Sequence, residues 1–86
     1  MLHVEYEKQP QKFLRRLKDK QLLKRILSRI EELALNPFPR ESVKVEGYKE
    51  KIFRVRVGNY RILYIIYNEK NTLLISDIDK RERVYD

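Results

Sequence analysis

Arginines in the middle of the chain are the residues best suited to do chemistry. Arg54, Arg56 and Arg61 lie within a stretch that reads Ile-Phe-Arg-Val-Arg-Val-Gly-Asn-Tyr-Arg-Ile-Leu-Tyr-Ile-Ile-Tyr, residues 52–67. A guanidinium group is permanently charged and binds a phosphate through two parallel hydrogen bonds. If the fold brings these side chains together, they suit the binding of an anion, most simply a phosphate group.

A β-hairpin is the element expected to bring the arginines together. Gly58-Asn59 separates two runs of β-branched and aromatic residues, and a two-residue Gly-Asn loop supplies the positive backbone angle of a tight turn. This turn predicts a register in which Arg56 faces Arg61. Because side chains alternate between faces, Arg54, Arg56 and Arg61 then share one face. The other face carries Phe53, Val55, Val57, Tyr60, Ile62 and Tyr64.

The clustered arginines have two interpretations. Like charges opposite each other on neighbouring strands destabilise a hairpin by about a few tenths of a kcal/mol, so stability alone gives no reason for the cluster. The face is either an anion site or a solvated surface that is rich in arginine. The hairpin by itself does not decide between them.

Length and composition predict one small domain over residues 1–86 and exclude several kinds of chemistry. The chain has no cysteine, and His3 is its only histidine, so a thiolate metal site, a disulfide framework and a histidine-based triad are not expected. We see no carboxylate pair with obvious spacing and no glycine-rich phosphate loop. We therefore expect no metal and no cofactor, and any catalysis must come from positioning and electrostatics.

The net charge indicates an acidic partner. Twenty basic residues against thirteen acidic ones give +7, which favours nucleic acid, an acidic protein or an anionic membrane surface. The start of the chain lacks the pattern of a signal peptide, and no apolar run has the length of a membrane span. We expect a cytoplasmic protein that does not bind membranes.

The remaining elements predict an α+β fold. Residues 2–6 alternate as a first strand, a helix begins at Pro10, and Asp19 caps a second helix that ends at Asn36-Pro37. Residues 43–45 form a short strand, a turn at Gly47 precedes the hairpin, and residues 72–78 form the last strand after a turn at 68–71. We expect an antiparallel helical hairpin on one face of a mainly antiparallel meander sheet. The first strand lies either at an edge or inside this sheet.

Basic residues dominate the two predicted helices. Their outer surfaces carry nine cations: Lys8, Lys12, Arg15, Arg16, Lys18, Lys20, Lys24, Arg25 and Arg29. Such a run is either a solvated face or an electrostatic footprint for nucleic acid. On the second interpretation, the residues predicted to contact RNA or the ribosome are Lys12, Arg15, Arg16, Lys24, Lys51, Lys80 and Arg83.

The end of the chain adds further cations and a tyrosine. It reads Asp-Lys-Arg-Glu-Arg-Val-Tyr-Asp from position 79, and an apolar, aromatic ending gains nothing by extending into water. If this tail folds back over the sheet, Arg81 or Arg83 and Tyr85 approach the three hairpin arginines. A cationic patch with one aromatic ring suits a phosphodiester and a stacked base.

With these segments in view, the chain resembles the RelE/ParE superfamily of toxins from bacterial and archaeal type II toxin–antitoxin pairs. The resemblance covers essentially the whole chain and is carried by Phe-Arg-Val-Arg at 53–56, Gly-Asn-Tyr-Arg-Ile-Leu-Tyr at 58–64 and Lys-Arg-Glu-Arg-Val-Tyr at 80–85. The middle segment marks the superfamily, and the arginine and tyrosine tail favours RelE over ParE.

The resemblance to RelE implies a ribosome-dependent endoribonuclease. Such toxins cut messenger RNA in the ribosomal A site without metal, by attack of a ribose 2′-hydroxyl on the adjacent phosphate, and a RelB-like antitoxin neutralises them. By position, Arg54 and Arg56 lie beside the scissile phosphate and Arg61 stabilises the pentacoordinate phosphate. Arg81 then assists the leaving oxygen, and Tyr85 stacks on a base and is a candidate proton acceptor.

One departure from the RelE pattern concerns the base. RelE enzymes have lysines where this chain has Arg54 and Arg56, and an arginine does not deprotonate in proteins, so the role of base falls to Tyr85. The alternative function is that of ParE, a non-enzymatic inhibitor of DNA gyrase. A third alternative is a basic protein that only binds RNA or its partner.

Overall fold

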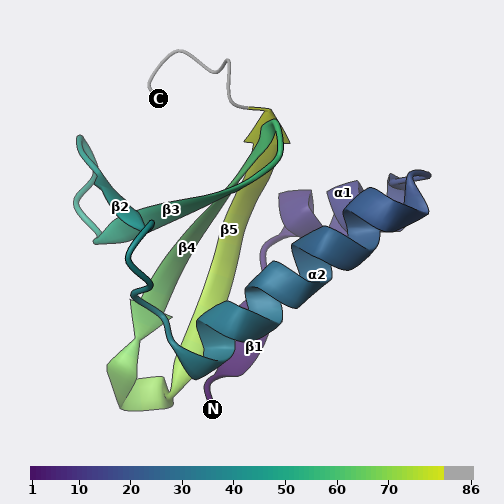
Figure 1. Ribbon diagram of the computed structural model, residues 1–86. Helices are drawn as coiled ribbons and strands as arrows, with labels where there is room; N and C mark the ends of the chain where they lie inside the picture. Colours follow the sequence, from purple (N-terminus) through teal and green to yellow (C-terminus); the bar gives the residue numbers. More distant parts are fainter. Residues whose placement is uncertain (81–86) are drawn as a thin grey trace.

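Five strands form one mixed sheet with two helices packed on one of its faces (Figure 1). The computed structural model describes residues 1–80. In chain order the elements are β1 (His3–Tyr6), α1 (Lys8–Arg16), α2 (Lys20–Leu35), β2 (Val43–Val45), β3 (Ile52–Val57), β4 (Tyr60–Tyr67), the 3-10 turn η1 (Asn68–Lys70) and β5 (Thr72–Lys80). The predicted α+β class is confirmed.

The β3–β4 hairpin has the predicted register. Val57 pairs with Tyr60 and Arg56 with Arg61 across the two-residue turn. Gly58 has a φ of +59°, in the left-handed region that favours glycine, whereas the φ of Asn59 is not positive. This combination is typical of a type II′ turn. The turn chemistry therefore sets which side chains face each other along the whole hairpin.

The first strand lies at an edge. The strand order is β1-β5-β4-β3-β2, and β1 pairs in parallel with β5 while the other neighbours are antiparallel. The chain therefore crosses the sheet through α1 and α2 before it returns along the opposite edge as β2. This pairing settles the alternative that the sequence left open.

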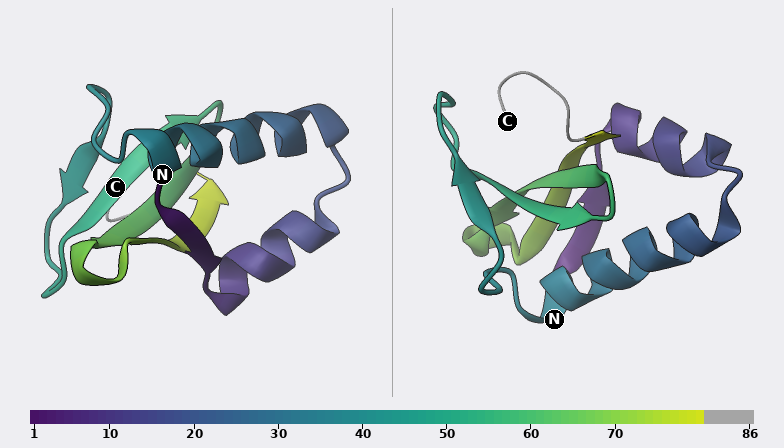
Figure 2. Two further views of the ribbon diagram at one scale, coloured as in Figure 1. Left: turned by 90° about the horizontal axis from the view of Figure 1, so that it is seen from below. Right: turned by 45° about the horizontal axis from the view of Figure 1, so that its top comes forward.

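The helices begin and end close to where the sequence predicts. Asp19 caps α2, because its Oδ1 accepts a hydrogen bond from the backbone N–H of Leu22 at 3.0 Å. The prediction that α1 begins at Pro10 is wrong, since α1 begins at Lys8. Proline is tolerated at the third helical position because the first four N–H groups of a helix have no intrahelical partner. The two helices run in opposite directions and diverge from their connecting turn (Figure 2).

The main core lies between the helices and the sheet. It is formed by Ile26, Ile30, Leu33 and Ala34 of α2 with Val55, Val57, Ile62, Tyr64, Leu73, Ile75 and Ile78 of the strands. Phe13 and Leu14 of α1 pack against this cluster. A second, smaller apolar cluster is formed by Ile52, Leu63 and Ile65. These residues alternate along β3 and β4 with the residues of the main core, so they lie on the sheet face that carries no helices.

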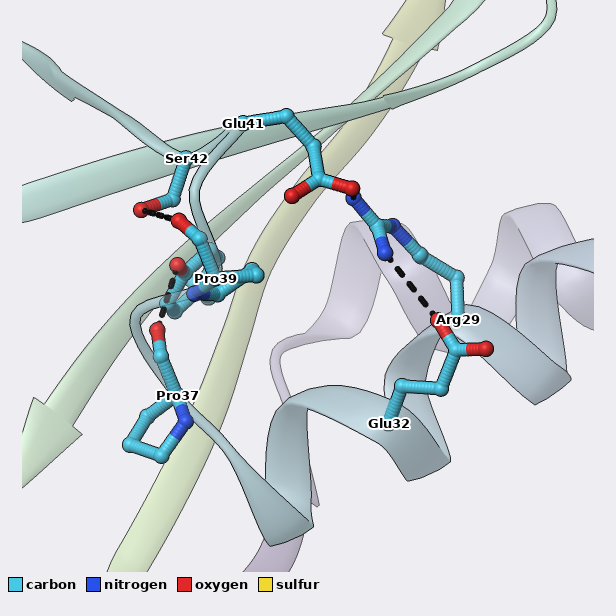
Figure 3. Close-up of polar contacts among 7 residues, drawn as sticks. Arg29, Glu32, Pro37, Pro39, Glu41 and Ser42 are labelled. Carbon is cyan, nitrogen blue, oxygen red and sulfur yellow. Dashed lines mark hydrogen bonds and ion pairs between the residues drawn. The ribbon is translucent and has the colours of Figure 1, made fainter.

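The loop between α2 and β2 is fixed to both layers of the fold (Figure 3). The hydroxyl of the fully buried Tyr64 donates to the carbonyl of Pro37 at 2.6 Å, and burial raises the pKa of Tyr64. Arg29 forms ion pairs with Glu32 at 3.0 Å and with Glu41 at 3.1 Å. Its side chain is 16% exposed. Arg29 therefore anchors this loop and is not part of the exposed basic face to which the sequence assigned it.

Candidate functional site

The structure brings Arg54, Arg56 and Arg61 onto the sheet face that the helices leave uncovered. We call these residues the arginine face. Arg56 and Arg61 are direct partners in the register, and Arg54 pairs with Leu63 one step further along the same face. The alternating residues Val55 and Ile62 lie in the core beneath the helices. The predicted sharing of one face by the three arginines is therefore confirmed.

The three arginines differ in exposure. Arg56 is exposed, Arg54 is half-buried, and Arg61 is only 2% exposed. One terminal nitrogen of Arg61, Nη2, donates to the backbone carbonyl of Lys80 at 2.9 Å. Arg61 thus holds the end of β5, the point from which the chain continues to residue 81.

Two aspartates that the sequence pattern did not predict share this face. Asp79 pairs with Arg61 and Asp77 pairs with Leu63 in the β4–β5 register, and directly paired residues lie on the same face. Two rows therefore cross the sheet, one of Arg56, Arg61 and Asp79 and one of Arg54, Leu63 and Asp77. The face carries carboxylates beside its guanidinium groups.

A β-bulge in β5 places the aspartates there. Tyr64 pairs with Ile75 and Leu63 with Asp77, so Ser76 is the extra residue, and its hydroxyl donates to the carbonyl of Leu63 at 3.2 Å. An uninterrupted strand would instead point Asp77 into the core with Ile75. The sequence holds a signal for this bulge, because the apolar alternation of Leu73 and Ile75 resumes one position late, at Ile78.

Gln9 of α1 fixes the strand beyond the bulge. Its side-chain amide donates to the carbonyl of Ile78 at 2.7 Å and accepts from the N–H of Ile78 at 2.9 Å. Since β1 pairs only with residues 72–75 of β5, this amide takes the place of a strand partner at Ile78. The contact holds Ile78 toward the core and hence the flanking Asp77 and Asp79 toward the open face.

A cleft of about 610 Å³ lies on the open face beside the arginines. The second apolar cluster forms part of its wall through Ile52, Leu63 and Ile65. Its polar lining includes Glu7, Lys8, Gln9, Tyr48, Glu50, Tyr67, Ser76 and Asp77. The volume falls in the usual range for small-molecule sites, and the cleft combines apolar surface with aromatic rings and carboxylates.

A second cleft, of about 670 Å³, connects the arginine face to α2. It is lined by Lys24, Arg25 and Arg29 of α2 together with Arg56 and the turn residue Gly58. A β-carbon added to Gly58 would lie 3.6 Å from the terminal nitrogens of Arg25, so this guanidinium group lies close to the turn. The two basic surfaces of the molecule therefore meet at the tip of the hairpin.

The other predicted contact residues lie at separate places. Lys12, Arg15 and Arg16 are exposed on α1, and Lys12 and Arg16 line a further cleft with Phe13. Lys51, just before β3, and Lys80, at the end of β5, are exposed close in sequence to the arginine face. The remaining predicted residues, Arg81, Arg83 and Tyr85, lie outside the described residues.

Within residues 1–80, the acidic residues and His3 form no cluster of three or more that could hold a metal ion. In the same part of the chain, no helix is long and apolar enough to cross a membrane.

The fold is that of small toxins from toxin–antitoxin systems. Residues 4–85 match the family model described as ParE toxin of type II toxin–antitoxin system, parDE. The chain therefore belongs to this family, and its relatives identify it as a RelE-like toxin.

Among these relatives is a protein of Methanocaldococcus jannaschii named as the toxin RelE1. It is 32% identical over 65 residues, which cover 73% of this chain and 72% of the relative. The RelE–RelB complex of the archaeon Pyrococcus horikoshii contains a chain that is 29% identical, with a TM-score of 0.79 over 96% of this chain and 98% of that one. The isolated RelE toxin of E. coli is 17% identical, with a TM-score of 0.80 over 98% and 88%, and its likeness concerns the fold alone.

Proposed function

We propose that this RelE-like toxin is a ribosome-dependent endoribonuclease that cuts messenger RNA in the A site and so inhibits translation in the cytoplasm. The observation that carries the proposal is the arginine face, which gathers Arg54, Arg56 and Arg61 on the open side of the sheet. Guanidinium groups suit a phosphodiester because they bind its oxygens bidentately and stabilise the charge that develops at phosphorus.

Each arginine has a role in this proposal that agrees with its surroundings. Arg54 and Arg56, the more exposed pair, contact the scissile phosphate. Arg61 is buried and bound to the carbonyl of Lys80, so it acts from beneath the substrate and also holds the end of β5. Arg81 assists the leaving oxygen, and Tyr85 stacks on a base. Neither Arg54 nor Arg56 can serve as the base.

We also propose an antitoxin partner. The P. horikoshii relative was solved as a RelE–RelB complex, and an acidic extended segment would complement the +7 charge of this chain. Such a segment would neutralise the toxin either by covering the arginine face or by displacing the C-terminal tail.

Mapping messenger breaks on translating ribosomes tests the activity. The wild-type chain should cut within the A-site codon, and Arg61→Ala and Tyr85→Ala should each reduce cutting by about tenfold to a thousandfold, as expected for lost transition-state contacts. Unchanged cutting in both variants would refute the site assignment.

Inhibition of DNA gyrase is the second candidate function, because the matching family model is that of the ParE toxin. A supercoiling assay with the purified chain separates the two functions. Inhibition of gyrase together with intact messenger RNA would establish the ParE-like function. Cleavage of messenger RNA without any effect on gyrase would establish the RelE-like function. Binding to RNA without either effect would leave a purely binding role.

A further inference from the structure

The reaction proposed above needs a group that takes the proton of the ribose 2′-hydroxyl. The three arginines cannot take it, and Tyr85, to which the sequence assigned this role, lies outside the described residues. We propose that the carboxylate of Asp77 is this proton acceptor, an inference that rests on the proposed function and names a further catalytic residue for it.

The bulge at Ser76 and the contacts of Gln9 turn Asp77 out of the core. Asp77 then lies in one row with Leu63 and Arg54, on three neighbouring strands of the open face. Strands lie about 4.8 Å apart, so the backbones of Arg54 and Asp77 are separated by roughly 10 Å with Leu63 between them. A phosphodiester held by the long side chain of Arg54 over Leu63 would place its ribose toward Asp77.

Asp77 also lines the open-face cleft, which gives a nucleotide access to its carboxylate. The side chain is half-buried, and Leu63, Ile65 and Leu74 line the same cleft. Several other titratable or charged groups lie around Asp77. Those that line the same cleft are Glu7 and Lys8 near the start of α1, Tyr48 and Glu50 before β3, and Tyr67 of β4. Arg54 of β3 and Asp79 of β5 lie on the same face of the sheet.

Asp79 is placed differently and has another role. Its Oδ1 accepts a hydrogen bond from the backbone N–H of Lys80 at 2.8 Å, and it lies directly across from the buried Arg61. Opposite charges paired across strands stabilise a sheet. Asp79 therefore positions the Arg61 row, whereas Asp77 lies in the cleft where the substrate would bind.

The proton balance of the step is complete. The 2′-oxygen forms a bond to phosphorus as its proton passes to the Asp77 carboxylate, and the bond between phosphorus and the 5′-oxygen breaks. The 5′-oxygen takes a proton from water, which gives a 2′,3′-cyclic phosphate and a 5′-hydroxyl, and Asp77 returns its proton to the solvent. General base catalysis by a positioned carboxylate contributes typically about 10² to 10⁴ in rate.

The test is single-turnover cleavage of messenger RNA on programmed ribosomes with saturating toxin. Asp77→Asn should slow cleavage by about 10² to 10⁴ while ribosome binding is retained. Wild-type cleavage should slow at acidic pH as the carboxylate becomes protonated, and Asp77→Asn should lose this pH dependence. Glu69→Gln, in η1, removes the same charge away from the arginine face and should cleave as the wild type does.

The outcomes separate this inference from the proposed function. If the wild type does not cut, the proposed function fails and the inference fails with it. If the wild type cuts and Asp77→Asn cuts at a rate within about threefold of the wild-type rate, the inference is overturned. The same holds if Asp77→Asn binds ribosomes more tightly and cleaves no more slowly. In both cases Asp77 only balances the charge of the arginines. The wild-type pH profile is independent of how the variant folds, and cleavage that does not slow at acidic pH would also overturn it.

Discussion

At the scale of single residues, burial divides the arginine face into two kinds of arginine. Arg56 is exposed, while Arg61 is buried and bound to the carbonyl of Lys80 at the end of β5. Arg61 is bound within the fold and is also proposed to stabilise the charge of the reaction, which complicates mutagenesis. A loss of activity on its replacement must be compared with the loss of stability.

We expect Arg61→Ala to lower the free energy of unfolding by about 1 to 3 kcal/mol, because the carbonyl of Lys80 loses a buried donor. Arg56→Ala should change it by less than about 0.5 kcal/mol, since Arg56 is exposed and faces the like charge of Arg61. Urea unfolding of the two variants measures both values. Equal losses in both would show that the contact between Arg61 and Lys80 contributes nothing specific.

At the scale of elements, the bulge in β5 and the loop before β2 decide what the sheet presents. The bulge reverses the faces of residues 77–79, and Gln9 holds the reversed segment from α1. The loop is held by Tyr64 from the sheet and by Arg29 from α2. Burial alone would lower the pKa of Arg29, but its contacts with Glu32 and Glu41 outweigh burial and raise it.

The contact of Glu41 with Arg29 makes part of the stability dependent on pH. The backbone N–H of Glu41 itself and then the Arg29 guanidinium hold the pKa of the Glu41 carboxyl below its ordinary value of 4.5. The unfolded chain therefore takes up this proton at a higher pH than the folded one. The stabilisation is complete above about pH 4.5 and is lost as the pH falls through the lower pKa of the folded state.

Glu41→Gln should therefore be less stable than the wild type at neutral pH, and the difference should shrink below about pH 4.5. Urea unfolding at a series of pH values gives this difference directly. Glu46→Gln, which removes an exposed carboxylate just after β2, is the matched control and should show a smaller change. A difference for Glu41→Gln that does not vary with pH would contradict the assignment.

At the scale of the whole molecule, the sheet separates two basic surfaces. Lys12, Arg15 and Arg16 lie on the helical side and the arginine face on the other, and the α2–hairpin cleft with Lys24 and Arg56 connects them. A structured RNA that contacted both sides would enclose the tip of the hairpin. The net charge of +7 would contribute to its affinity through released counterions.

Ribosome affinity should accordingly fall with added salt, and Lys12→Ala and Lys24→Ala should each reduce the slope of log affinity against log salt by about 0.7 to 1. Lys70→Ala, in η1 near the ring of Tyr67, is the control and should leave the slope unchanged. Binding titrations at several salt concentrations measure these slopes. An equal change in all three variants would indicate general electrostatic attraction without defined contacts.

Local chemistry made much of this fold predictable from the sequence. The Gly58-Asn59 turn predicts the hairpin register and the common face of Arg54, Arg56 and Arg61, and Asp19 predicts the start of α2. Such features depend on neighbours in the chain, since turn geometry and alternation act over a few residues. The membership of the toxin family follows from the same local motifs.

Tertiary contacts decided what the arginine face contains. The edge position of β1 and the contact of Gln9 with Ile78 depend on segments that lie 69 residues apart in the chain, and the bulge at Ser76 depends on the pairing of β5 with β4. Together they place Asp77 and Asp79 beside the arginines. The sequence by itself determined a row of cations, and only the packing of β5 against β4 and α1 made it a mixed site of guanidinium and carboxylate groups.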